Sequence, residues 1–143
     1  MDKPAISGNS ILVPSDLKYL VDVDNFVEAF LRDWGLNEST VADIAISVSE
    51  LVNNAVEHGN ATKVSADDDR AVKVTVRKIA SAVKISVADQ GHGFDPTKIE
   101  DPLAEENLLK AAGRGIFIVR NLMDEVDVKT TPDGTVVTIT KNV

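Results

Sequence analysis

The sequence predicts an α+β fold, a two-layer α/β sandwich in which helices cover one face of a mostly antiparallel mixed sheet. Apolar residues recur at helical spacing in two segments before residue 60. After residue 70 they alternate with period two in two adjacent pairs of segments, which is typical of hairpins. Because no helix separates the members of each pair, the order differs from that of a Rossmann repeat.

The first half of the chain predicts one strand and two helices. The strand covers residues 10–13, and the first helix runs from an N-cap at Ser15 to Gly35. The second helix begins near Glu38 and ends before Gly59, a C-cap candidate. Its apolar stripe consists of Val41, Ile44, Ala45, Val48, Leu51, Val52, Ala55 and Val56.

The second half predicts two hairpins, separated by a loop and a helix. The four strands contain residues 72–76, 83–87, 126–128 and 137–139. Residues 89–115 form a long loop rich in Gly and Pro, with a helical segment near residues 103–111, and the helix 116–123 follows. Loops of this length inside a compact domain are commonly lids or binding loops.

Composition limits the class of protein. The chain has 143 residues, 43% of them apolar and 4% aromatic, which suits a single domain, residues 1–143, with one aliphatic core. The net charge of −8 disfavours nucleic acid as a partner. No apolar run is long enough for a membrane span or a signal peptide, so we expect a cytoplasmic protein without a membrane partner. The absence of Cys fits a reducing compartment.

Glu50 and Asn54 form the first candidate site. They lie at i and i+4 on a helical face that points away from the apolar stripe. From residue 37 to residue 60 the chain has four acidic residues and no Lys or Arg, whereas a solvated helix face normally mixes charges. A hydrated Mg²⁺ would relieve the repulsion, with Asn54 as a ligand and Glu50 as a proton acceptor. The alternative is that Glu50 and Asn54 merely lie on the solvent-facing side of an amphipathic helix.

A second candidate site begins at Asp89, directly after a predicted strand. It also includes Gly91, Gly93 and Phe94. A carboxylate at a sheet edge can accept a hydrogen bond from an exocyclic amine such as adenine N6. The glycines would let the backbone approach the base. The alternative is a turn that only reverses the chain.

A third candidate site is formed by Gly113, Arg114 and Gly115, at the start of a helix. Free N–H groups at a helix N-terminus bind phosphate, and Arg114 adds a possible charge-assisted contact. The alternative is a flexible hinge before a core helix. No P-loop motif occurs in the chain, so a nucleotide would have to bind by another architecture.

Together these segments resemble the histidine-kinase-like ATPase superfamily, and most of all its anti-sigma-factor serine/threonine kinases. The matching blocks are Ser49–Gly59, which corresponds to the N-box, Asp89–Phe94, and Gly113–Val119 with its closing segment Leu122–Val126. The resemblance implies a Bergerat-type ATP-binding fold with a mobile ATP lid, and ATP and Mg²⁺ as cofactors.

The resemblance also implies roles for individual residues. Asn54 would ligate Mg²⁺, Glu50 would be the general base, and Asp89 would read adenine. His58 would approach the phosphates, or else would be a helix C-terminal residue stabilised by the helix dipole. The remaining residues implied to bind the nucleotide are Gly91, Gly93, Phe94, Gly113, Arg114, Gly115 and Ile116.

The leading hypothesis is a protein serine/threonine kinase that acts as an anti-sigma factor in transcription regulation. By resemblance it would phosphorylate a serine on an anti-sigma antagonist, sequester a sigma factor and form a homodimer. The alternative is a nucleotide-binding interaction module without kinase activity, which would not need Glu50 as a base. We expect the chain, from Met1 to just past its last strand, to be a stand-alone protein and not a fragment of a sensor kinase.

Overall fold

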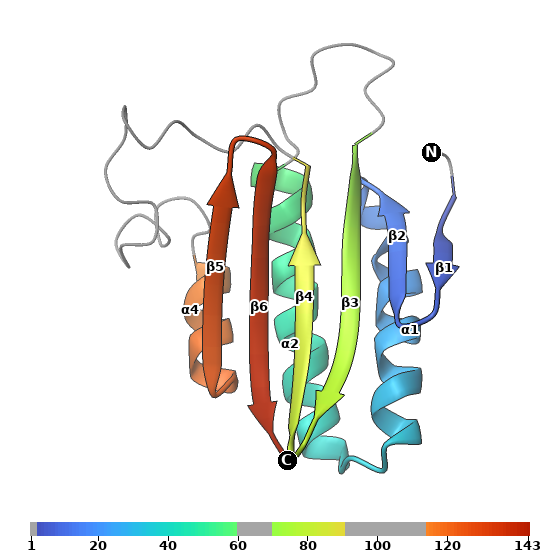
Figure 1. Cartoon of the computed structure of the whole chain (residues 1–143), viewed down its shortest axis with the longest axis vertical. Helices are drawn as coiled ribbons and strands as arrows, with labels where there is room; N and C mark the ends of the chain where they lie inside the picture. The colour runs from blue at the N-terminus through green and yellow to red at the C-terminus, as the bar shows by residue number, and fades with distance from the viewer. Residues whose placement is uncertain (1–2, 60–69, 91–113) are drawn as a thin grey trace.

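The computed structural model describes residues 3–59, 70–90 and 114–143, which form one sheet covered on one side by helices (Figure 1). The strand order is β1-β2-β3-β4-β6-β5, and every pairing between these strands is antiparallel. The strands are β1 Ala5–Ser7, β2 Ser10–Pro14, β3 Ala71–Ile79, β4 Ala82–Ala88, β5 Glu125–Thr131 and β6 Gly134–Asn142. The predicted two-layer α+β sandwich is confirmed.

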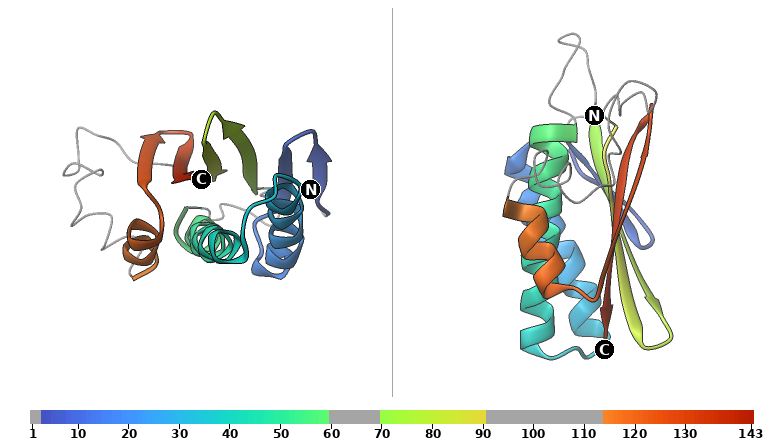
Figure 2. Two further views of the ribbon diagram at one scale, coloured as in Figure 1. Left: turned by 90° about the horizontal axis from the view of Figure 1, so that it is seen from below. Right: turned by 90° about the vertical axis from the view of Figure 1, so that its left-hand side faces the viewer.

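Three helices form the second layer. They are α1 Leu20–Asp33, α2 Glu38–Asn54 and α4 Arg114–Leu122, together with a 3-10 turn, η1 Leu17–Tyr19, and a π-helical turn, η2 Ala55–Gly59. Figure 2 shows that all of them lie on the same face of the sheet. Among the described residues, no helix has the length and apolarity needed to cross a bilayer.

Local signals at the helix ends explain most of the boundaries. Asn37 caps α2, where its side chain accepts a hydrogen bond from the Thr40 N–H at 2.8 Å, so the predicted start near Glu38 is confirmed. Gly35 follows α1 with a φ of +74°, as expected of a residue beyond a helix C-terminus.

Two details at the N-terminal end differ from the prediction. The predicted N-cap at Ser15 is wrong, because Asp16 accepts the hydrogen bond from the Lys18 N–H at 3.0 Å and a 3-10 turn precedes α1. Strand β1 was not predicted, since its three residues are all exposed and a strand this short has no alternation to detect.

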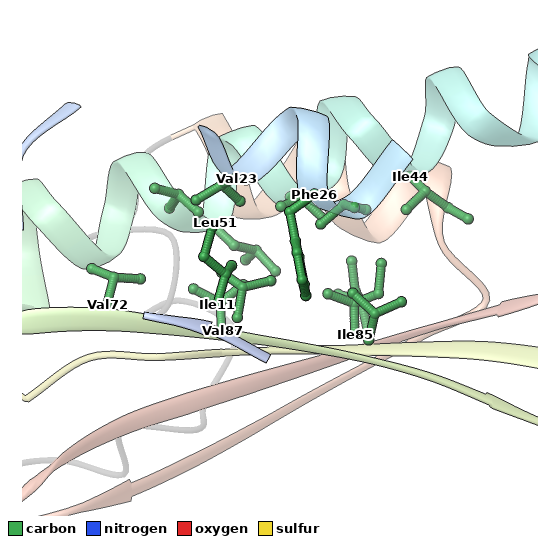
Figure 3. Packing of buried hydrophobic residues seen from close by; sticks show 14 of the residues in the cluster. Ile11, Val23, Phe26, Ile44, Leu51, Val72, Ile85 and Val87 are labelled. Atoms are coloured by element: carbon green, nitrogen blue, oxygen red, sulfur yellow. The ribbon is translucent and has the colours of Figure 1, made fainter. Parts of the chain in front are cut away.

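The core is aliphatic, as the composition predicts, and it fills the space between the sheet and the helices. Figure 3 shows Ile44 and Leu51 of α2 and Val23 and Phe26 of α1 facing the strands. Phe26 is the only aromatic residue among the described buried side chains. The buried strand residues that meet these helices are Ile11, Val13, Val72, Val74, Val76, Val83, Ile85, Val87 and Ile139. This packing anchors α2 across the middle of the sheet, where it carries the first candidate site.

Candidate active site

The first candidate site lies where α2 meets the beginning of α4. Helix α4 begins at Arg114, two residues before the predicted start, so Gly115 belongs to its first turn. A Cβ atom at Gly115 would lie 2.7 Å from Glu50 Oε2, and 3.3 and 3.5 Å from Asn54 Nδ2 and Oδ1. The structure therefore brings Glu50, Asn54 and Gly115 together from two segments that are about sixty positions apart in the sequence.

This polar face of α2 is only partly exposed to solvent. Glu50 and Asn54 are half-buried, and Gly115 and Ile116 beside them are buried. The side chain of Ile116 belongs to the hydrophobic core, so only its backbone could contact a ligand. The first N–H groups of an α-helix lack acceptors within the helix. Gly115, in the first turn of α4, lies next to two side chains that carry oxygen atoms. Such an arrangement can hold an anion on the N–H groups and a hard cation on the oxygens.

The charge pattern on α2 is partly neutralised by other elements. Glu38 pairs with Arg32 of α1 at 2.6 Å, and Asp43 pairs with Lys141 of β6 at 3.7 Å. The repulsion inferred from the absence of Lys and Arg in residues 37–60 is therefore relieved at these two carboxylates by cations from other segments. Glu50 forms no ion pair with any residue of the described ranges.

The amide oxygen of Asn54 fits a Mg²⁺ ion for which phosphate supplies further ligands. No group of three or more His, Cys, Asp or Glu residues that could hold a metal occurs within residues 3–59, 70–90 and 114–143. Mg²⁺ prefers oxygen ligands, keeps several waters and usually takes only one or two protein groups together with substrate phosphates. The amide oxygen of Asn54 is a ligand of the required kind, and the neighbouring Glu50 carboxylate remains available to accept a proton.

A hydrogen bond between α1 and α2 holds the residue next to Glu50. The Ser49 hydroxyl donates to Asp24 Oδ1 at 3.2 Å. Burial raises the pKa of the Asp24 carboxyl, the bond from Ser49 lowers it, and repulsion from Glu28 raises it, so that the net pKa is above its ordinary value. This contact ties the start of the Ser49–Gly59 block to the neighbouring helix.

The second candidate residue, Asp89, directly follows β4 and is held by the start of β6. Its N–H donates to the Thr135 carbonyl at 2.9 Å, and the Thr135 N–H donates to Asp89 Oδ1 at 3.1 Å. Sequence reasoning assigned no functional role to Thr135 or to the adjacent Gly134. The only local signal was the turn sequence Thr131-Pro132-Asp133-Gly134, which predicts a hairpin and nothing about Asp89.

The candidate residues lie toward one end of the molecule. Helix α2 and strand β4 both run toward the end drawn at the top of Figure 1, and α4 runs back from that side. Gly91, Gly93, Phe94 and Gly113 lie outside the described residues, as do the side chains of His58 and Arg114. The predicted roles of these six residues stay predictions.

The chain is similar in sequence to a known domain family and to named proteins. The family described as "Histidine kinase-like ATPase domain" matches residues 13–141. An anti-sigma F factor of Thermoanaerobacter sp. (strain X514) is 34% identical over 120 residues, which cover 80% of this chain and 79% of that protein. The serine-protein kinase RsbW of Bacillus pumilus is 33% identical over 135 residues, or 90% of this chain and 82% of that protein.

Solved structures share the fold at low sequence identity. A structure of the RsbU and RsbW domains of a Mycobacterium tuberculosis protein is 21% identical, with a TM-score of 0.62. The alignment covers 94% of this chain but only 32% of that one. A blue-light activated histidine kinase of Erythrobacter litoralis EL346 is 20% identical, with a TM-score of 0.56 and coverage of 91% and 42%. These likenesses show the fold alone.

Proposed function

The chain belongs to the histidine kinase-like ATPase domain family, and we propose that it is an ATP- and Mg²⁺-dependent protein serine/threonine kinase that acts as an anti-sigma factor. The observation that supports this proposal best is the meeting of Glu50 and Asn54 with the first turn of α4 at Gly115. An oxygen ligand, a carboxylate base and a set of helix N–H groups are together the minimum that phosphoryl transfer needs from a protein.

Each residue of this group has a distinct role in the proposed reaction. Asn54 Oδ1 ligates Mg²⁺, which when bound neutralises phosphate charge. The N–H groups at the start of α4 hold phosphate oxygens. Glu50 accepts the proton of a partner serine hydroxyl as the serine oxygen forms a bond to the γ-phosphorus. The bond between the γ-phosphorus and the β,γ-bridging oxygen breaks, and ADP leaves with that oxygen.

Asp89 supplies base recognition in this scheme. A carboxylate can accept a hydrogen bond from the exocyclic amine of adenine, and the contact with Thr135 holds the Asp89 side chain in place. Gly91, Gly93, Phe94, Gly113, Arg114 and His58 complete the proposed nucleotide site.

The proposed partners follow from the names of the relatives. Proteins called anti-sigma F factor and serine-protein kinase RsbW match most of this chain, which supports a sigma factor and a serine-bearing antagonist as its partners. We further propose that residues 1–143 act as one domain, that the protein forms a homodimer, and that it works in the cytoplasm.

ATP binding is expected to require a divalent cation. Both the phosphates and Glu50 are negative, so nucleotide held at the start of α4 would be repelled unless a bound Mg²⁺ neutralised the phosphate charge. Calorimetry should detect ATP binding by the purified chain in Mg²⁺ and little or none in EDTA. No binding under either condition would refute the proposed function, and equally tight binding in EDTA would refute the Mg²⁺ dependence.

A side chain at position 115 is expected to weaken ATP binding. In Gly115→Ala the new methyl group would lie 2.7 Å from Glu50 Oε2, so α4 must move away from α2 or Glu50 must turn aside. We expect ATP affinity in Mg²⁺ to fall by roughly tenfold or more, the effect of losing one hydrogen bond to a charged group. Asn121→Ala, an exposed change near the other end of α4, is the control, and equal affinity of both variants for ATP would contradict the close packing at Gly115.

A further inference from the structure

The regular main-chain pairing of β4 with β6 ends at Asp89. The ladder runs regularly as far as the pair Ala88 and Val136. At the next step the Asp89 N–H donates to the Thr135 carbonyl at 2.9 Å, as in a regular antiparallel pair. The Thr135 N–H, however, donates at 3.1 Å to the side-chain oxygen Oδ1 of Asp89. A main-chain group of β6 therefore helps to set the orientation of this carboxylate.

Gly134 allows the turn between β5 and β6 to approach Asp89 closely. Its φ is +151°, in the region that favours glycine. A Cβ atom on Gly134 would collide with the Asp89 carbonyl oxygen and would lie 3.1 Å from the carbonyl carbon. Any other residue at this position would therefore push the turn away from the end of β4.

The turn itself is held by hydrogen bonds of its own. The Thr131 hydroxyl donates to the Gly134 carbonyl at 3.3 Å and accepts from the Asp133 N–H at 3.2 Å. The hydroxyls of Thr130 and Thr135 are bonded to each other at 2.8 Å. A turn restrained in this way can act as a firm support for Asp89.

We propose that the β5–β6 turn, through Gly134 and the main-chain N–H of Thr135, sets the base selectivity of the nucleotide site by positioning the Asp89 carboxylate. This inference rests on the proposed function, in which Asp89 accepts a hydrogen bond from the exocyclic amine of adenine. Hydrogen bonds weaken steeply with distance and misalignment, so a displaced carboxylate loses its preference for a purine with an amine at position 6. Gly134 and Thr135 are positioning residues, and Asp89 is the residue that contacts the base.

The same contact predicts the effect of changing Asp89 to Asn. The amide oxygen would keep the hydrogen bond from the Thr135 N–H, because that donor needs an oxygen acceptor. The NH₂ group of the amide would then replace the second carboxylate oxygen. A donor facing position 6 disfavours the amine of adenine and favours the carbonyl oxygen of guanine. Asp89→Asn should therefore shift the preference from ATP toward GTP.

The test compares the affinities of the full chain for three nucleotides in Mg²⁺: ATP, GTP and purine riboside triphosphate, which lacks the exocyclic amine. Wild type should bind ATP at least about tenfold more tightly than the amine-free analogue, the expected effect of one hydrogen bond to a charged acceptor. In Gly134→Ala this ratio should fall toward one. Asp133→Ala, an exposed change in the same turn that keeps the main-chain bond to Thr131, should leave the ratio as in wild type.

The ratio separates positioning from simple loss of stability. A variant that is only less stable binds all three nucleotides less well in equal proportion, so an unchanged ratio in a folded Gly134→Ala protein would overturn the inference. If Gly134→Ala fails to fold, the Asp89→Asn variant tests the inference instead. A ratio of GTP to ATP affinity in Asp89→Asn equal to that of wild type would overturn the inference. Absence of ATP binding by wild type would instead refute the proposed function itself.

Discussion

Replacing Glu50 by Gln is expected to leave ATP affinity unchanged and to lower serine phosphorylation by a factor of about 10² to 10⁴, the usual contribution of a general base. Gln occupies nearly the same volume as Glu, so the close approach of Gly115 to this side chain is kept. It cannot accept the proton of the serine hydroxyl. The measurement is transfer of labelled γ-phosphate from ATP to the antagonist protein of the same organism, with ATP affinity determined separately by calorimetry.

Glu57→Gln is the matched control for this experiment. Glu57 lies in the turn η2 that continues α2, it is exposed, and the change removes the same charge without touching the meeting point with α4. The control should phosphorylate at the wild-type rate. A Glu50→Gln protein as fast as wild type would show that Glu50 is not the base. A wild type that binds ATP but transfers nothing would favour a nucleotide-binding module without kinase activity.

Replacing Asn54 by Ala is expected to reduce ATP affinity in Mg²⁺ to the level that wild type shows in EDTA. Asn54 lies beside Gly115 at the start of α4, and its amide oxygen is the neutral oxygen ligand of the proposed Mg²⁺ site. With this ligand removed, the cation no longer connects the phosphates to α2. Calorimetric titration of ATP into the variant, with and without Mg²⁺, measures the effect directly.

Asn53→Ala is the corresponding control, since Asn53 is the preceding residue of α2, is half-buried as Asn54 is, and has no role in the proposed site. It should retain Mg²⁺-dependent ATP binding. If Asn54→Ala still binds ATP more tightly in Mg²⁺ than in EDTA by the wild-type factor, Asn54 is not the metal ligand. Thermal unfolding of both variants checks that neither effect comes from loss of the fold.

The local part of the site could be predicted because it depends on the periodicity of one helix. Glu50 and Asn54 share a face of α2 independently of the tertiary fold, since residues four apart lie on the same side of any α-helix. The direction of that face also followed from the apolar stripe, whose members Ile44, Val48, Leu51 and Val52 are buried as expected.

Charge compensation could not be predicted in the same way. The acidic run on α2 has no basic residue nearby in its own segment, yet Arg32 of α1 and Lys141 of β6 pair with two of its members. Lys141 lies almost a hundred positions from Asp43 in the sequence, and its Nζ also donates to the Leu122 carbonyl at the end of α4, at 2.7 Å. An inference about repulsion drawn from one segment omits the charges that folding brings to it.

The sequence by itself determined the order of the main strands and helices, the covered face of the sheet, and the residue types at the candidate site, because these follow from short-range periodicity and backbone preferences. Only the tertiary structure decided that Gly115 meets Glu50 and Asn54, and that the turn at Gly134 supports Asp89. The physical reason is that such contacts depend on how closely two backbones approach when the core closes. Steric fit between segments that are distant in the sequence sets the distance between their backbones. The residue pattern within each segment does not specify this distance.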